Sequence, residues 1–228
     1  MITFFTSKAR AFTVFVFTLA YLGIFILSTI TPTIIINTGG IIIAGIWLML
    51  FAIPFHWFGK KFPAFYLASV ALNAIAAGFS VSEYFIHIET KPEIAHLLVG
   101  ALPAVAILLA VYLMLQVFSK TKKITVTVAC ILNALITVGL TVLWIINGHT
   151  IFSFGFFCSL ISFFFLCVFG ITINHDERSV LRDISFGGFG SFIIVTVVVI
   201  FILSEGEILD GMDVLDIGDG KKKTKKSK

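Results

Sequence analysis

The sequence predicts an all-α integral membrane protein, a bundle of seven transmembrane helices. Of its 228 residues, 59% are hydrophobic and 12% are charged, about half the roughly 25% of charged residues in a soluble domain. Long stretches contain no Asp, Glu, Lys or Arg, and each is long enough for one or two spans of about 20 residues. They cover residues 11–59, 62–82, 94–119, 124–175 and 184–204. The stretches are continuously apolar rather than alternating, which favours helices over a β-barrel in lipid.

Two of these stretches are too long for one helix, and each contains a turn signal. In the first, Pro32 follows a run of hydroxyl residues, and in the second the tetrapeptide from Asn147 to Thr150 contains Gly148. Both are typical of turns. The predicted spans are therefore residues 11–31, 34–56, 63–83, 95–118, 124–146, 151–173 and 185–204.

The chain changes character after the last span. Acidic residues recur from Glu205 to Asp219, and lysines follow immediately. Blocks of like charge with few large apolar residues are typical of disorder. We therefore expect a transmembrane domain over 1–204 and a charged, disordered tail over 205–228.

The positive charges between the predicted spans indicate an orientation. Short cytoplasmic loops carry an excess of Lys and Arg. Nine such residues lie on one side of the predicted bundle, against Lys91 alone on the other. The nine are Lys8, Arg10, Lys60, Lys61, Lys120, Lys122, Lys123, Arg178 and Arg182. This bias predicts a multi-pass protein of the cell membrane, with the N-terminus cytoplasmic and the C-terminus outside.

The tail leaves a second location open. If the C-terminus lies outside, the lysines of the tail could contact anionic lipids or wall polymers. These lysines are Lys221, Lys222, Lys223, Lys225, Lys226 and Lys228. The last four residues also fit a di-lysine retrieval signal, so the alternative is the endoplasmic reticulum of a eukaryotic cell. Nothing in the sequence predicts binding to nucleic acid.

Two asparagines have matching surroundings in the third and fifth predicted spans. Asn73 and Asn133 each follow a leucine and precede an alanine, about ten residues after a Lys-Lys pair. This predicts similar depths in parallel helices, and an architecture of three helical hairpins plus a seventh helix. Asn37, beside a Gly-Gly pair, is a third polar candidate. Such amides either line a path for a polar solute or join neighbouring helices, and the second role is commoner.

The remaining candidate side chains are glutamates, histidines and phenylalanines. The loop after the third span contains Glu83, and beyond it His87, Glu93 and His96 are candidate ligands for a divalent metal. Because these ligands straddle a Lys-Pro pair that breaks any shared helix, we predict no metal and no cofactor. The histidines lie at or beyond the predicted helix ends. The phenylalanines of the sixth span, concentrated from Phe154 to Phe165, either line a lipophilic pocket or face acyl chains, and the second is expected.

Small residues four positions apart predict close helix contacts, within the chain or with other membrane proteins. Examples are Ala74 with Gly78 and Gly187 with Ser191.

No nucleotide, hydrolase or metalloprotease motif occurs in the chain, and three functions remain open. First is a non-enzymatic accessory or envelope-associated membrane protein that acts through helix packing. Second is a passive carrier or channel for a neutral or lipophilic small solute. Third is an intramembrane lipid-modifying enzyme that uses the outer histidines and glutamates. The predicted spans lack the charges that proton-coupled pumps retain in the membrane, which argues against such a pump.

Overall fold

The computed structural model describes residues 7–36, 40–87, 93–117, 122–174 and 180–216. These residues form seven α-helices and one π-helical turn, with no strand among them. The elements are α1 (Ser7–Ile30), η1 (Thr31–Ile36), α2 (Ile41–Phe58), α3 (Ala64–His87), α4 (Ile94–Val117), α5 (Lys122–Asn147), α6 (Thr150–Asn174) and α7 (Val180–Asp216). The described residues contain seven segments long and apolar enough to cross a membrane, one on each α-helix. The predicted all-α bundle of seven transmembrane helices is therefore confirmed.

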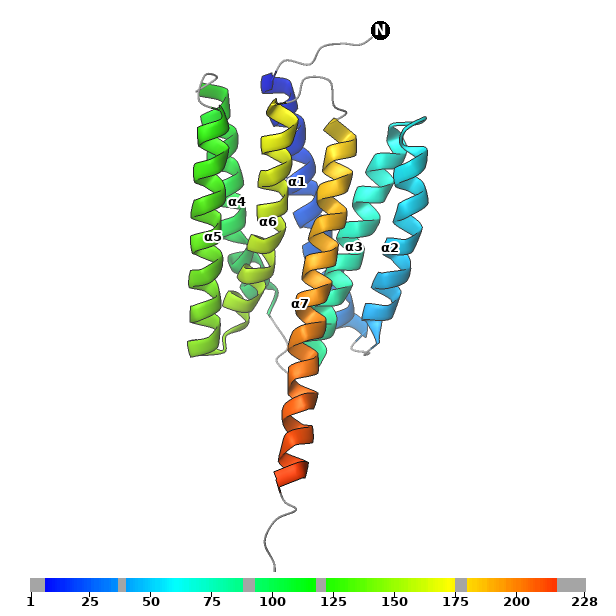
Figure 1. Cartoon of the computed structure of the whole chain (residues 1–228), viewed down its shortest axis with the longest axis vertical. Coiled ribbons are helices and arrows are strands. Elements are labelled where there is room, and N and C mark those ends of the chain that lie inside the picture. The colour runs from blue at the N-terminus through cyan, green and yellow to red at the C-terminus, as the bar shows by residue number, and fades with distance from the viewer. Residues whose placement is uncertain (1–6, 37–39, 88–92, 118–121, 175–179, 217–228) are drawn as a thin grey trace, which may run out of the picture.

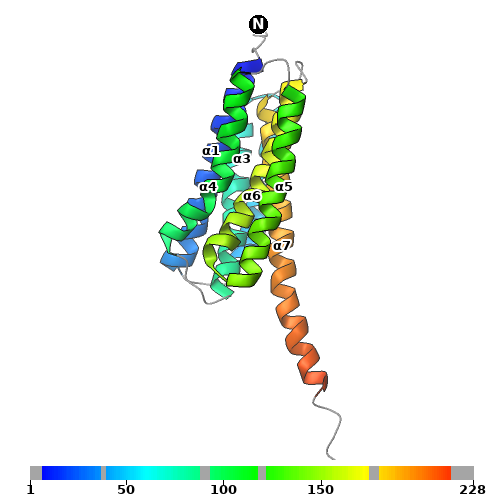
Figure 2. The same cartoon turned by 90° about the vertical axis from the view of Figure 1, so that its left-hand side faces the viewer.

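Two helices form the centres of the bundle. α3 packs against α1, α2 and α7, and α6 packs against α1, α4, α5 and α7. Figure 1 shows α4 and α5 on one side and α2 and α3 on the other, with α1, α6 and α7 between them. α1, α3, α5 and α7 all begin at the end of the bundle where the chain starts, which is called the N-terminal end below. Figure 2 shows the same alternation of helix direction from the side.

The expected set of three hairpins plus a seventh helix does not describe this packing fully. α5 and α6 do pack as a hairpin. α3, however, packs mainly against α1, α2 and α7, while α4 packs against α1, α5 and α6. The two hairpins expected to contain Asn73 and Asn133 therefore have different neighbours in the fold.

The first turn does not occur at Pro32. The chain continues through this residue as η1, and α2 begins at Ile41 rather than at the predicted residue 34. Proline lacks the N–H that an α-helix needs, and the wider π-turn is a known way to pass such an irregularity. Thr31 and Thr33 donate hydroxyl hydrogen bonds to Leu27 O (2.9 Å) and Thr29 O (2.6 Å), which keep this segment helical.

The second predicted turn is confirmed. α5 ends at Asn147, α6 begins at Thr150, and Gly148 between them has φ +64°. This left-handed conformation is the one that glycine adopts without a steric penalty.

Aromatic side chains of α6 form much of the core. Phe154, Phe157, Phe165 and Phe169 are fully buried, so the expectation that the phenylalanines of this span face lipid is wrong for these four. Phe154 stacks against Phe25 of α1, with ring centroids 5.5 Å apart. The reason is that α6 contacts four other helices and has little surface left for lipid.

Small residues bring the helices together inside the bundle. A Cβ on Gly78 would lie 2.5 Å from Ser28 Cβ and 2.7 Å from Phe25 O, so α3 and α1 approach closely there. A Cβ on Gly187 would lie 2.6 Å from Val168 Cγ2 of α6. These two of the predicted small-residue faces are therefore used within the chain.

α7 is longer than its membrane segment. The segment suited to the membrane ends at Ser204, whereas the helix continues to Asp216 and projects beyond its neighbours (Figure 1). The structure thus differs from the expected disordered tail over residues 205–216. Residues 217–228 lie outside the described residues, and disorder there stays a prediction.

Candidate functional site

α3 has one polar face that runs along most of its length. Ser69, Asn73, Ser80, Glu83 and His87 follow one another at intervals of four, seven, three and four residues. Residues at such intervals share one side of an α-helix. From first to last they span 18 residues, about 27 Å of helix, close to the roughly 30 Å thickness of a hydrocarbon core. The term "α3 polar face" is used for these five residues.

At the N-terminal end, the α3 polar face meets α7 and α2. Ser185 donates a hydrogen bond to Ser69 Oγ (3.0 Å), and its own Oγ lies 2.8 Å from His56 Nδ1. Both serines are fully buried, and His56 is 7% exposed. Although His56 lies near the end of α2 as predicted, it points into the bundle rather than toward water. The His56 ring makes edge contacts with Tyr66, Phe186 and Phe189.

A second hydroxyl pair joins α3 and α7 further along. The Oγ of Ser80 and the Oγ1 of Thr196 lie 2.8 Å apart. From the Ser69–Ser185 pair to this one, each helix advances by 11 residues, about 17 Å. α3 and α7 therefore run parallel and in register, with one polar pair in each half of the bundle.

Asn73 lies between these two pairs, near the middle of α3. It is the tenth of 24 residues in the helix, which places it about 4 Å from the midpoint. Its side chain is fully buried, and its Nδ2 donates to Ser69 O (2.9 Å). Its Oδ1 has no hydrogen-bond partner among the described residues. Buried amide oxygens are normally hydrogen-bonded, so an unpartnered one requires an explanation.

The neighbours of Asn73 are also polar or small. The Tyr21 hydroxyl of α1 lies 3.3 Å from Asn73 O and 3.4 Å from Gly188 O of α7. One hydroxyl hydrogen serves both of these long contacts, so two carbonyl oxygens converge on a single donor. Because Gly188 has no side chain, the backbone of α7 lies directly opposite Asn73.

Asn133 has a different environment from Asn73. Its Nδ2 donates to Ser159 O (2.9 Å), and its Oδ1 accepts from Ser159 Oγ (3.2 Å). Both ends of the amide are thus bonded to one residue of α6. Asn133 joins α5 to α6, which is the packing role weighed for both asparagines.

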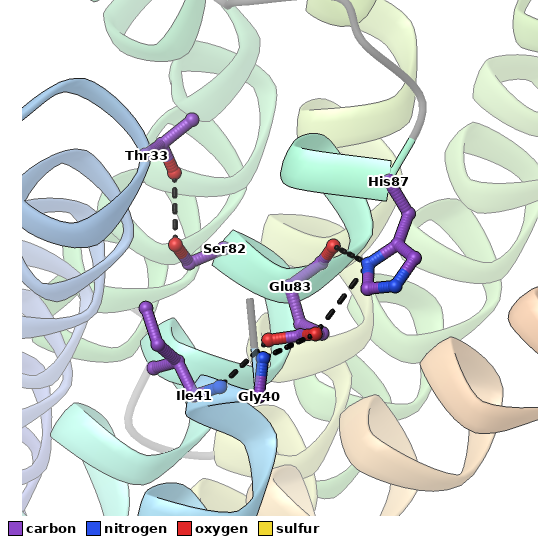
Figure 3. A network of polar contacts seen from close by, with 6 residues as sticks. All are labelled: Thr33, Gly40, Ile41, Ser82, Glu83 and His87. Atoms are coloured by element: carbon purple, nitrogen blue, oxygen red, sulfur yellow. Dashed lines mark hydrogen bonds and ion pairs between the residues drawn. The ribbon is translucent and has the colours of Figure 1, made fainter. Parts of the chain in front are cut away.

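At the far end of the α3 polar face, Glu83 binds the beginning of α2. Its Oε1 accepts from Gly40 N and its Oε2 from Ile41 N, each at 2.8 Å (Figure 3). The residue is 3% exposed. His87 Nδ1 lies 3.4 Å from Oε1 and 3.0 Å from the Glu83 carbonyl oxygen. Beside them, the hydroxyls of Thr33 and Ser82 lie 2.9 Å apart and join η1 to α3.

The start of α2 explains why a carboxylate is needed here. The first N–H groups of a helix have no partner within the helix. The N-cap residue is Gly40, which has no side chain to supply an acceptor and has φ +82°. Glu83 supplies both acceptors from the neighbouring helix, and its negative charge faces the positive end of the α2 dipole.

The position of Glu83 changes two expectations. It lies inside α3, one turn before the end, so assigning it to a loop is wrong. The segment Ala64–His87 suited to the membrane includes it, so the expectation of spans without charge is also wrong here. Ionisable groups within such segments usually mark functional sites.

The metal-ligand candidates lie on two different helices. His87 ends α3 and contacts Glu83, while His96 is in the first turn of α4 with its Nε2 3.8 Å from Glu93 Oε2. Within the described parts of the chain, no group of three or more His, Cys, Asp or Glu side chains is placed to hold a metal ion. Asn37 and the six tail lysines lie outside the described residues.

The sequence contains a pattern that indicates the α3 polar face. Polar residues recur on α3 at intervals of three and four, which is helical spacing, so this stripe was readable before the fold was known. His56 had no such signal, because it is one polar residue on an otherwise apolar helix. Tyr21, Ser185 and Thr196 lie among other polar residues of α1 and α7, and nothing in those two sequences singles them out. Their partners become clear only from the packing of α3 against three other helices.

The fold defines a multi-pass helical membrane protein, and α3 carries a polar face that is largely buried in the bundle. No protein-family model, curated protein sequence or solved structure matches the chain. Its function is therefore argued from its own residues.

Proposed function

We propose that the protein is a carrier for small, neutral, polar solutes, with the solute path between α3 and α7. It narrows the second of the three functions that the sequence left open, a passive carrier or channel for a neutral or lipophilic small solute, to polar solutes. The observation that supports it best is the unpartnered Oδ1 of Asn73, fully buried near the middle of α3. Discontinuous helices and midplane polar groups are common at the substrate sites of carriers.

The chemistry of the path indicates the class of solute. An unbonded amide oxygen in an apolar environment costs roughly 1–3 kcal/mol, and a solute with an O–H or N–H donor removes that cost. The groups on either side are hydroxyls, from Ser69 with Ser185 and from Ser80 with Thr196. Hydroxyls both donate and accept, so they suit a neutral solute with hydroxyl or amide groups.

The other two functions receive less support. An accessory protein that acts through packing alone needs bonded polar groups, as at Asn133, whereas Asn73 Oδ1 is left unbonded. The pair of His56 and Ser185 resembles an activated nucleophile in geometry, but Ser185 is fully buried and its second partner is another serine. We therefore propose a non-enzymatic role.

We also propose that the carrier resides in the cell membrane with its N-terminal end cytoplasmic. The support is the charge bias of nine Lys and Arg residues, before the first predicted span and in the connectors on the same side, against one in the connectors on the other side. In this orientation His56 lies toward the cytoplasm and Glu83 toward the outside.

Uptake by proteoliposomes tests the carrier function. Purified protein is reconstituted, and entry of labelled urea, glycerol and glucose is compared with entry into protein-free liposomes. We expect the wild type to accelerate at least one of these solutes. Asn73→Leu should lose that uptake while remaining folded, because the only change is the loss of the central amide.

Asn133→Leu is the matched control, since it makes the same substitution on another helix of the same direction. It should retain uptake per folded molecule even if it is less stable. Wild-type entry no faster than through protein-free liposomes for every solute would overturn the proposal, as would equal uptake by Asn73→Leu and wild type. Either result would favour the accessory role.

A further inference from the structure

We propose that Glu83 is a proton-binding site, and that protonation of its carboxylate releases the first turn of α2 from α3. Its use in transport rests on the carrier function proposed above, and would change that carrier from a passive one to one coupled to the proton. The expected lack of charge in the spans argued against such coupling, but Glu83 lies within the segment of α3 suited to the membrane. The conformational step does not depend on transport and can be measured without it.

The Glu83 carboxylate joins α3 to the first turn of α2 by hydrogen bonds. Each oxygen accepts one backbone hydrogen bond of 2.8 Å from α2, a length typical of bonds to an ionised carboxylate. In the first turn of α2, Gly40, Ile43 and Ala44 are exposed, and Ile42 is half-buried against the core. One turn later the helices are close, since a Cβ on Gly45 would lie 3.0 Å from Ala76 O. Release is therefore confined to the turn before Gly45.

Protonation changes the balance of donors and acceptors. The ionised carboxylate offers two acceptor oxygens to two N–H donors. After protonation one oxygen carries a hydrogen and has less acceptor capacity, and the bonds from the two N–H groups no longer end on an ionised carboxylate, so they become weaker. The charge that opposes the α2 dipole is lost in the same step. Both effects weaken the same contact.

Among the described residues, few other charged groups lie near this carboxylate. His87, on the same helix, contacts Glu83 through Nδ1 (3.4 Å). The neighbouring Tyr84 is buried. The segments of α1, η1, α2 and α7 toward this end, residues 18–36, 40–50 and 190–204, contain no Asp, Glu, Lys, Arg or His. Glu93 and His96 begin α4 at this end and form a pair of their own. Separate substitutions of Glu83 and of His87 therefore show which of the two residues controls the release of α2.

A spin label on α2 measures the release directly. Ala44→Cys is exposed in the first turn and accepts a nitroxide in a protein whose Cys130, Cys158 and Cys167 have been replaced by alanine. Electron paramagnetic resonance is recorded on full-length protein in liposomes from about pH 4 to about pH 9, a range that covers Glu and His titration. We expect a docked population at high pH and a released one at low pH. Their ratio should change tenfold per pH unit near the midpoint, as one proton requires.

Three variants make the result specific to Glu83. Glu83→Gln should show the released spectrum at every pH, because its amide cannot offer two acceptors. Glu93→Gln, the same change at an exposed glutamate of the same end, should behave as wild type, and His87→Gln should retain the transition. A label at Ile53→Cys, also exposed on α2 but beyond Gly45, should not respond to pH.

A wild-type spectrum that is independent of pH overturns the proposal. So does a transition that persists in Glu83→Gln, or one that disappears in His87→Gln. The outcome is separate from that of the uptake assay. A protein that shows the transition but moves no solute keeps the proton site and loses only its coupling to transport. A protein that moves solute without the transition keeps the carrier and loses the proton site.

Discussion

At the scale of single residues, Asn73 and Asn133 show how far local sequence can be trusted. Both lie in the same short motif, and the sequence predicted similar depths with the same two possible roles, lining a solute path or joining helices. In the structure, both ends of the Asn133 amide bond to Ser159, whereas the Oδ1 of Asn73 has no hydrogen-bond partner among the described residues. Whether a buried amide finds a hydrogen-bond partner depends on the helices packed against it. The sequence of its own helix does not show which helices those are.

The Asn133 contact should be a measurable source of stability. We expect Asn133→Leu to lower the free energy of unfolding by about 0.6 to 2 kcal/mol, the usual range for a polar contact between membrane helices. Unfolding in mixed detergent micelles measures this value. Because Ser159 is its partner in both side-chain bonds, Ser159→Ala and Asn133→Leu should not be additive. Additive losses would show that the two residues do not act as a pair.

At the scale of the elements, the sequence predicted which segments are helices better than which faces are buried. Length and lack of charge were enough to find seven spans, because lipid requires the backbone to bond within each helix. They did not show that Phe154 and Phe165 face the core, since large apolar residues occur around the whole circumference of α6 and most of its few hydroxyl residues are buried with them. Pro32 was misleading because a π-turn satisfied the backbone without ending the helix.

The α1–α3 contact should depend on the absence of a side chain at one position. In Gly78→Ala the new methyl would meet Ser28 and the backbone of Phe25, so we expect a loss of about 1–3 kcal/mol, as for overpacking in a core. Gly23→Ala is the control, because its Cβ would have nothing within 4 Å. It should be neutral or gain up to ~1 kcal/mol from helix propensity. Thermal unfolding of both variants measures the difference, and equal stabilities would contradict the close approach.

At the scale of the whole molecule, two central helices organise the bundle. α3 packs against α1, α2 and α7. α6 packs against α1, α4, α5 and α7. α1 and α7 therefore contact both central helices. The number of helices and their alternation followed from the sequence. Their neighbours did not, because apolar helices of similar length offer many equivalent arrangements until small and polar residues select one.

The proposed orientation can be tested at two described connectors. Lys61 lies in the turn between α2 and α3, and His149 lies in the turn between α5 and α6 at the opposite end; both are exposed. A membrane-impermeant maleimide applied to intact cells should label His149→Cys and spare Lys61→Cys, in a protein without its native cysteines. Permeabilised cells should allow both to react. The reverse pattern in intact cells would invert the orientation.

The short length of α2 has a consequence for the surrounding lipid. α2 has 18 residues and its neighbour α3 has 24, a difference of about 9 Å. A bilayer of uniform thickness cannot match both helices, so the lipid beside α2 has to thin or the first turn of α2 has to shift. Membrane thickness would thus act on the same turn that Glu83 holds. We expect the docked state to be favoured in thin bilayers and the released state in thick ones.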